Sequence, residues 1–237
     1  MMDLESLRLR TVEVTDERSA VAASAFALIE STFARQDRHS IEELRAEVAE
    51  KRYEILKPFD YHLLAAVDSE ERVVAVAVGV YLAGVNAGFV DYLVVREDVR
   101  GCGVGHVLRE QLAAAFAANA EEAGQAPLAA VLGEVREDNP WLLRLVRNGR
   151  AVPLHLTYYH PALPLGGKRY ILYRQPVGDR RTEFPPAEVG QMLYAIYRRA
   201  YRVRYPLERE TFRAMLEELA SRPTVGAHPD VVQRAGA

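Results

Sequence analysis

The chain lacks the residues that disulfides and thiolate metal sites need, because Cys102 is its single cysteine. One thiol cannot close an internal disulfide or build a multi-cysteine metal site. Long apolar runs are missing as well: no stretch approaches the roughly 20 residues of a membrane span. Asp3, Arg8 and Arg10 also interrupt any signal-peptide pattern. We therefore predict a cytoplasmic protein with no membrane partner and no bound metal.

A strong excess of one charge is also missing. The 30 basic and 33 acidic residues leave a formal net charge of -3, which argues against a surface tuned as a whole for nucleic acid or anionic lipid. Lysine occurs at positions 51, 57 and 168 alone, and such an arginine excess is typical of a high-GC bacterial source. A hydrophobic content of 49% excludes a wholly disordered chain.

Apolar periodicity predicts alternating strands and helices. The apolar, β-branched runs predict strands at 7–14, 61–67, 73–82, 89–95, 128–135, 152–158 and 170–173. Helices are predicted from an N-cap at Thr15, from a Ser40–Glu43 capping box, from Val104 to a stop at Gly124, from Pro140 to Gly149, and over 187–205 and 207–220. Residues 179–186 read as a linker, and the end of the chain as a frayed tail.

Three closely spaced glycines lie in the middle of the chain, between a predicted strand and a predicted helix. Gly101, Gly103 and Gly105 stand between the strand that ends at Val95 and the helix from Val104. Free backbone N–H groups at such a helix start suit a phosphate or diphosphate. A Walker loop is excluded because no lysine lies near, and the dinucleotide fingerprint fails because His106 stands where it needs glycine.

The pattern that does fit is R-x-x-G-x-G, formed by Arg100, Gly103 and Gly105. It resembles the acetyl-CoA diphosphate loop of the GNAT-type N-acetyltransferases, whose pattern is Q/R-x-x-G-x-G/A. The order of strands and helices is similar to that family, as is Asn139 before a short helix that closes at Gly149. The resemblance spans roughly residues 7–177. It implies an α/β GNAT-type fold with a central mixed, mostly antiparallel sheet flanked by helices. The expected domains are a transferase domain at 1–178 and a helical C-terminal extension at 179–237.

The resemblance also implies acetyl-CoA as the cofactor, an amine acceptor and a set of cofactor-binding residues. Acetyl then passes directly from the CoA sulfur to a primary amine of a small molecule or peptide, and one strand amide binds the thioester oxygen. The strand end pairs with the pantetheine arm, and the loop backbone holds the diphosphate. The implied cofactor-binding residues are Leu93, Val94, Val95, Arg100, Gly101, Cys102, Gly103, Val104, Gly105, His106 and Asn139.

Four residues are candidates for catalysis. Glu134, at a predicted strand end, is a candidate base for the amine proton, and Asp91 is a candidate base or amine anchor. Many family members carry a tyrosine acid on the short helix, but Val146 stands at that position. Tyr158 or Tyr159 could supply the acid instead, or the thiolate could leave unaided.

Other interpretations of the chain stay open. A CoA-binding sensor or interaction module without catalysis would keep the glycine loop and lack the acid. The last predicted helices carry tyrosines interleaved with arginines, a pattern that nucleic-acid-binding proteins also show. We interpret this stripe as a packing or homodimer face, because glutamates lie close by to neutralise the arginines.

Overall fold

The computed structural model describes residues 9–35, 38–55, 61–137, 139–164, 167 and 170–236. Contacts within the chain define two compact units. The first comprises Met1–Tyr81 and Val90–Gly124, and the second comprises Leu82–Phe89 and Gln125–Ala237. The expected boundary between residues 178 and 179 remains a prediction.

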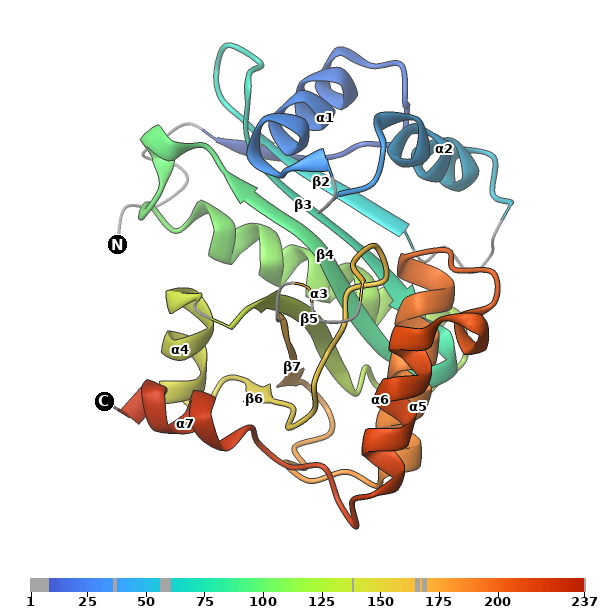
Figure 1. Cartoon of the computed structure of the whole chain (residues 1–237). Helices are drawn as coiled ribbons and strands as arrows, with labels where there is room; N and C mark the ends of the chain where they lie inside the picture. Colours follow the sequence, from blue (N-terminus) through green and yellow to red (C-terminus); the bar gives the residue numbers. More distant parts are fainter. Residues whose placement is uncertain are drawn as a thin grey trace. The chain divides into compact units, whose positions relative to one another are not determined.

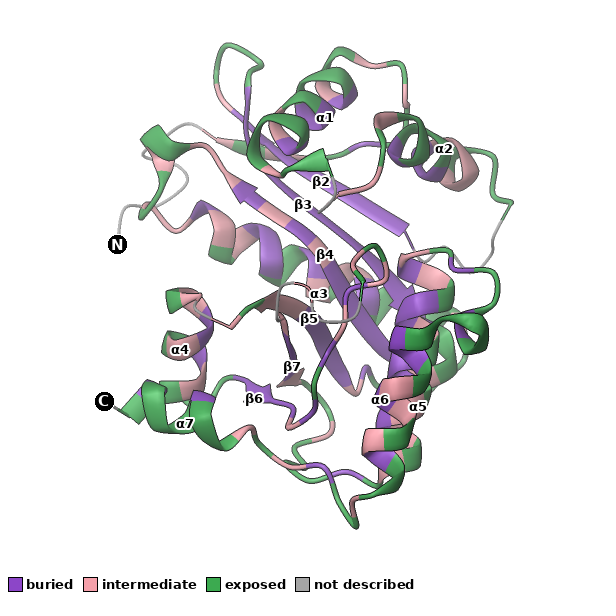
Figure 2. Cartoon of the chain, viewed as in Figure 1, coloured by how far each residue is buried: buried purple, intermediate pink, exposed green. Residues whose placement is uncertain are grey.

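The first unit is built on four strands in the order β1-β2-β3-β4, and the pairs β1–β2 and β2–β3 are antiparallel. Every residue of β2 and β3 is buried, so both faces of these strands are covered (Figure 2). Three helices accompany the strands (Figure 1). The bounds are β1 Arg10–Glu13, α1 Ala20–Thr32, α2 Ile41–Arg52, β2 Tyr61–Val67, β3 Val73–Leu82, β4 Ala87–Val95 and α3 Val104–Glu122. Residues 7 and 8 of the first predicted strand lie outside the described residues.

The starts of α1 and α2 in this unit follow side-chain capping. The predicted capping box is confirmed: Ser40 Oγ accepts from Glu43 N–H, and the Glu43 carboxylate accepts from Ser40 N–H. The N-cap expected at Thr15 is wrong, because α1 begins after Ser19. Asp16 accounts for the difference: its carboxylate accepts from the N–H of Arg18 and its carbonyl from the N–H of Ser19, which holds the preceding residues in a turn.

The second unit carries the strands β5 (Ala130–Arg136), β7 (Tyr170–Pro176) and β6 (Val152–Pro153), in the order β5-β7-β6 with antiparallel pairing. The strand expected at 152–158 is therefore too long. The ladder to β7 ends at Leu154, because Leu156 N–H, the next one on the side of β7, donates to Leu154 O at 3.0 Å. His155 N–H, on the other side of the strand, donates to Gly226 O at 2.9 Å. Tyr158 returns to the sheet through a single bridge to Tyr170.

Helices make up the rest of the second unit. The helix predicted over 187–205 is shorter, since α-helical geometry stops at Ala195 and a π-helical turn follows it. The helix predicted from residue 207 begins at Glu210, after a 3-10 turn. The bounds are η2 Ala83–Val85, α4 Pro140–Arg147, α5 Pro186–Ala195, η4 (the π-helical turn) Ile196–Ala200, η5 Pro206–Glu208, α6 Glu210–Ala220 and α7 Pro229–Gly236.

The end of the chain is helical where a frayed tail was expected. Helix α7 lies beside α4 (Figure 1), and Val231 is fully buried in a cluster with Leu142 and Leu145. Arg147 Nε also donates to Ala235 O at 2.6 Å. Burial of apolar side chains stabilises this helix in a way that the proline and glycine content near it did not indicate. Together, the strands and helices confirm the predicted α/β class with mostly antiparallel strand pairing.

Candidate functional site

The glycine loop connects β4 to α3 through the short helix η3 (Glu97–Val99). Gly101 and Gly103 have φ angles of +83° and +87°, in the left-handed region that favours glycine. A Cβ at either position would meet no described atom within 4 Å. Backbone conformation therefore requires glycine here, and the space beside both residues is open to a ligand.

The N-terminus of α3 starts where this loop ends. The helix follows Gly103 and is 19 residues long, and no side chain among the described residues caps it. Its first-turn N–H groups and the positive end of its dipole are thus presented together. His106 N–H donates within the turn to Gly103 O at 3.0 Å, and its ring lies 3.2 Å from Glu110 Oε1. This arrangement suits an anion such as a diphosphate.

The end of β4 packs closely on the start of α3. A Cβ at Gly105 would lie 3.1 Å from Val95 Cγ2 and 3.9 Å from Leu93 Cδ2, so glycine permits this approach of helix and strand. Val94 is buried while Leu93 and Val95 are half-buried, which fits the alternation of side chains along a strand. Arg100 Nε donates to Val95 O at 3.0 Å and ties the loop to the strand end.

The two remaining loop residues of the predicted set have unremarkable surroundings. Cys102 is half-buried, and its Sγ lies 4.0 Å from Arg100 O. Val104 is buried in the packing of α3. The geometry thus assigns the anion-binding character of the loop to its backbone.

Asp91 lies on β4 in a buried pair with a histidine that the sequence did not single out. His39 Nε2 is 3.6 Å from Asp91 Oδ2, and the two side chains are 9% and 7% exposed. His39 N–H donates to the hydroxyl of Tyr92 at 2.8 Å, which holds the histidine against the strand. Asp91 and Leu93 are two residues apart on one strand, about 7 Å, and share a face. The pair therefore borders the strand end predicted to bind pantetheine.

Glu134 is placed in the second unit, on β5, with a side chain only 7% exposed. Burial raises the pKa of its carboxyl from 4.5 to about 7, although the nearby hydroxyls of Tyr158 and Tyr201 oppose this shift. His160 Nε2 lies 3.8 Å from Glu134 Oε1. A carboxyl with a pKa near neutrality can exchange a proton readily at physiological pH.

The two candidate acids differ in their surroundings. Tyr158 is 1% exposed and is one of the hydroxyls at Glu134. Tyr159 is half-buried and is held by its backbone: its carbonyl accepts from Tyr197 Oη at 2.5 Å, and its N–H donates to Met215 Sδ at 3.5 Å. The structure thus brings Tyr158, and not Tyr159, to the carboxyl of Glu134.

The side chain of Asn139 caps a helix among the described residues. Its Oδ1 accepts from Trp141 N–H at 2.9 Å and caps α4, with Pro140 at the first helical position. Trp141 packs edge-on against Tyr173, with 5.5 Å between ring centroids. Val146 is half-buried beside the apolar cluster of α4 and α7.

Sequence reasoning missed three side chains of these sites: His39, His160 and Tyr201. His39 follows a loop, and only the fold brings it to β4. His160 and Tyr201 are far from Glu134 in the sequence, and nothing in their spacing connects either one to it. The tyrosines of the C-terminal tyrosine–arginine stripe differ in their exposure to solvent. Tyr197 is fully buried, whereas Tyr194 and Tyr205 are 46% and 53% exposed.

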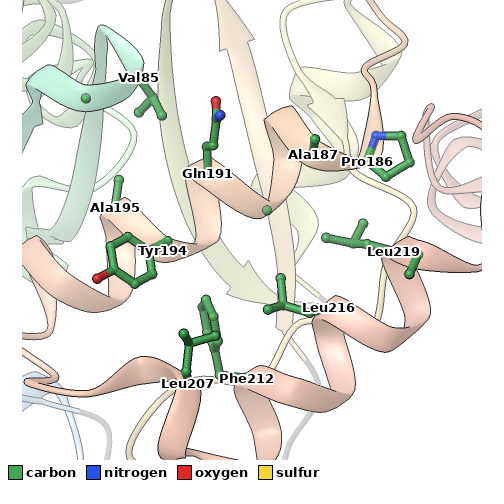
Figure 3. A pocket seen from close by; sticks show the side chains of 13 residues that line it. Val85, Pro186, Ala187, Gln191, Tyr194, Ala195, Leu207, Phe212, Leu216 and Leu219 are labelled. Carbon is green, nitrogen blue, oxygen red and sulfur yellow. The ribbon is translucent and has the colours of Figure 1, made fainter.

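An apolar groove of about 720 Å³ lies in the second unit between η2, α5 and α6. Figure 3 shows Tyr194 of α5 above Leu207 and Phe212, and the rings of Tyr194 and Phe212 are 6.2 Å apart. The lining is mostly apolar and includes the amide of Gln191. Most of the groove is formed by α5 and α6 of the C-terminal extension, and η2 contributes Gly84 and Val85.

In the described part of the chain, no group of three or more His, Cys, Asp or Glu side chains is arranged to hold a metal ion. No helix in the described ranges is long and apolar enough to cross a membrane.

Comparison with protein families and known structures agrees with this geometry. The model of the acetyltransferase (GNAT) family matches residues 26–149, just over half of the chain. Among curated proteins, none matches significantly. The match confirms the family resemblance drawn from the R-x-x-G-x-G loop and the predicted class of enzyme, an acetyltransferase, and acetyl-CoA agrees with this family as the cofactor.

Solved structures show the same fold at low sequence identity. A protein assigned to the GNAT family from Bacteroides thetaiotaomicron has a TM-score of 0.57 at 13% identity, covering 82% of this chain and 99% of its own. A protein assigned as an acetyltransferase from Acinetobacter baylyi has a TM-score of 0.52 at 15% identity, covering 72% and 94%. The NatC complex bound to Gag peptide and CoA has a TM-score of 0.50 at 16% identity, covering 72% and 99%. These likenesses confirm the predicted fold.

Proposed function

Because the chain belongs to the GNAT acetyltransferase family, we propose that it transfers acetyl from acetyl-CoA directly to a primary amine of a small molecule or peptide. The observation that carries this proposal is the glycine loop at the uncapped N-terminus of α3, with Gly101 and Gly103 in the left-handed region. Open space beside both glycines and first-turn N–H groups fit a diphosphate. The same family and composition lead us to place the reaction in a bacterial cytoplasm.

The residues of the first unit hold the cofactor in this proposal. The backbone from Arg100 to His106 binds the diphosphate, and the edge of Leu93–Val95 pairs with the pantetheine arm. When bound, acetyl-CoA supplies the acetyl group, whose C–S bond breaks as the C–N bond to the acceptor forms. A strand amide that donates to the thioester oxygen stabilises developing negative charge, a contribution that reaches several kcal/mol in acyl transfer.

Glu134 is the proposed general base. It accepts the proton that the acceptor ammonium must lose before its nitrogen can attack. A pKa of about 7 suits this task, because the carboxylate is populated at neutral pH and still binds a proton well. Tyr158, which contacts Glu134, is the favoured donor to the departing sulfur, and Asp91 with His39 is the favoured anchor for the amine.

A second candidate is a CoA-binding sensor without turnover, which Val146 at the usual tyrosine position favours. A thiol-release assay separates the two functions: acetyl-CoA is incubated with small amines and with peptides that have free N-termini, and free CoA is measured. Acceptor-dependent thiol release, lost in Glu134→Gln, supports the transferase. CoA binding without release for any amine supports the sensor and contradicts the transferase.

The homodimer predicted through the C-terminal helices is part of the proposal. Leu207 and Tyr194, 59% and 46% exposed, lie at the apolar groove of this extension. Sedimentation analysis of the wild type and of Leu207→Glu tests it. A dimer that the charge dissociates supports the proposal, and a monomeric wild type at all concentrations contradicts it.

A further inference from the structure

The carboxyl of Glu134 is surrounded by side chains from two separate stretches of the second unit. Tyr158 and His160 come from the segment after β6, and Tyr201 comes from the C-terminal extension. Tyr201 directly follows η4 and is far from Glu134 in sequence. The surroundings of this carboxyl are therefore completed by a part of the chain outside the region that the family model matches.

The hydrogen bonding of His160 defines which way its ring donates. His160 Nδ1 accepts from Ala162 N–H at 3.1 Å, so Nδ1 carries no proton. In the neutral ring the proton is then on Nε2, the nitrogen that lies 3.8 Å from Glu134 Oε1. His160 thus presents an N–H to the carboxyl of Glu134.

Tyr201 is fixed by a π-helical turn and by ring packing. Its N–H donates to Ile196 O at 3.1 Å, five residues back, and π-helical turns often occur at functional sites. Its ring meets His160 edge-on at 4.7 Å and Phe89 at 5.9 Å between centroids. The residue that ends the π-helical turn therefore contacts both Glu134 and the histidine beside it.

The C-terminal helices also fasten the segment that bears Tyr158 and His160. Tyr197 Oη donates to Tyr159 O at 2.5 Å. The carboxylate of Glu218 on α6 accepts from Thr157 N–H at 3.0 Å. These contacts hold the backbone on either side of Tyr158.

We propose that Tyr201 and His160 are positioning residues for Glu134. Through Tyr201, the C-terminal extension then contributes to the active site of the acetyltransferase. The inference rests on the proposed function, in which Glu134 is the base. The Tyr201 hydroxyl and the Nε2–H of His160 both lie beside the carboxylate, so their dipoles favour its ionised form within a buried environment. The extension thereby has a role other than a dimer or nucleic-acid surface.

The test measures the proton affinity of Glu134 without any substrate. Protein labelled with ¹³C at glutamate carboxyls is titrated by NMR, and the Glu134 signal is identified by its loss in Glu134→Gln. In Tyr201→Phe the ring contacts remain and the hydroxyl beside the carboxylate is lost, so the proton affinity of Glu134 should increase about tenfold. His160→Phe, which keeps a ring and removes the N–H, should act in the same direction. Tyr205→Phe is the matched control, since Tyr205 is an exposed tyrosine of the same extension, and it should change nothing.

The activity profile is measured on the same variants. The pH at which kcat/KM reaches half its maximum should rise with the proton affinity of Glu134, while CoA binding stays unchanged. A Glu134 titration that neither Tyr201→Phe nor His160→Phe alters overturns the inference. A titration that moves while the activity profile does not overturns the base role of Glu134 instead, so the two failures are distinguishable.

Discussion

Replacing Glu134 with glutamine should stabilise the protein at alkaline pH while it removes activity. Burial raises the pKa of this carboxyl from 4.5 to about 7. In the unfolded chain the group ionises near 4.5, so folding at higher pH forces a charge into a buried position. The difference between these pKa values corresponds to about 3 kcal/mol at about pH 8.

The sign and pH window of this effect follow from the two pKa values. Below about pH 4.5 the carboxyl is protonated in both states, and Glu134 adds no pH-dependent term. As the pH rises to about 7, the unfolded chain has lost its proton while the folded protein keeps it, so the wild type loses stability. The neutral amide of Glu134→Gln removes that loss. The stability of the variant relative to the wild type should therefore rise by about 3 kcal/mol between about pH 4.5 and pH 8.

Urea unfolding of both proteins across this pH range measures the difference, with the midpoint compared at an unchanged m-value. In parallel, kcat/KM of the variant should fall about 10²–10⁴-fold, the usual contribution of a general base. A stability difference that is the same at every pH would refute the raised pKa. Full activity of Glu134→Gln would refute its role as the base.

Three further changes test other parts of the account. Gly105→Val should push the start of α3 away from Val95 and weaken CoA binding at least about tenfold in calorimetry, and unchanged affinity would contradict the close approach argued here. Asp91→Asn should raise KM for the amine about tenfold and leave CoA affinity unchanged, because it removes the anionic member of the pair with His39; a loss of CoA affinity alone would assign Asp91 to the cofactor. Val231→Ala should lower the free energy of unfolding by about 2 kcal/mol, since the side chain is fully buried; a neutral effect would mean that α7 contributes nothing to the second unit.

The sequence predicted the glycine loop because the requirements there are local. Positive φ angles and a helix start depend on residues within one short segment, so the spacing of Arg100, Gly103 and Gly105 carried the information. The capping box at Ser40 was predictable for the same reason. The glycine loop and the capping box both depend on residues that are close together in the sequence.

The surroundings of Glu134 were not predictable in that way. His160 and Tyr201 reach its carboxyl through packing between distant stretches, which periodicity does not describe. Helix α7 was missed for a similar reason, because burial of Val231 against α4 outweighs the weak helix signal of the last residues. The strand predicted at 152–158 ends early because Leu156 N–H donates to Leu154 O and not to β7.

The central claim, that the backbone of the glycine loop binds the diphosphate of CoA, is tested most directly by calorimetric titration of CoA and of pantetheine, which lacks the diphosphate. The wild type should bind CoA at least about tenfold more tightly than pantetheine, and Gly103→Val should abolish that preference. Gly124→Ala is the matched control, because Gly124 also has a positive φ, +65°, at the opposite end of α3, and it should keep the preference. Equal affinity of the wild type for both ligands, or a preference that survives in Gly103→Val, would contradict the account.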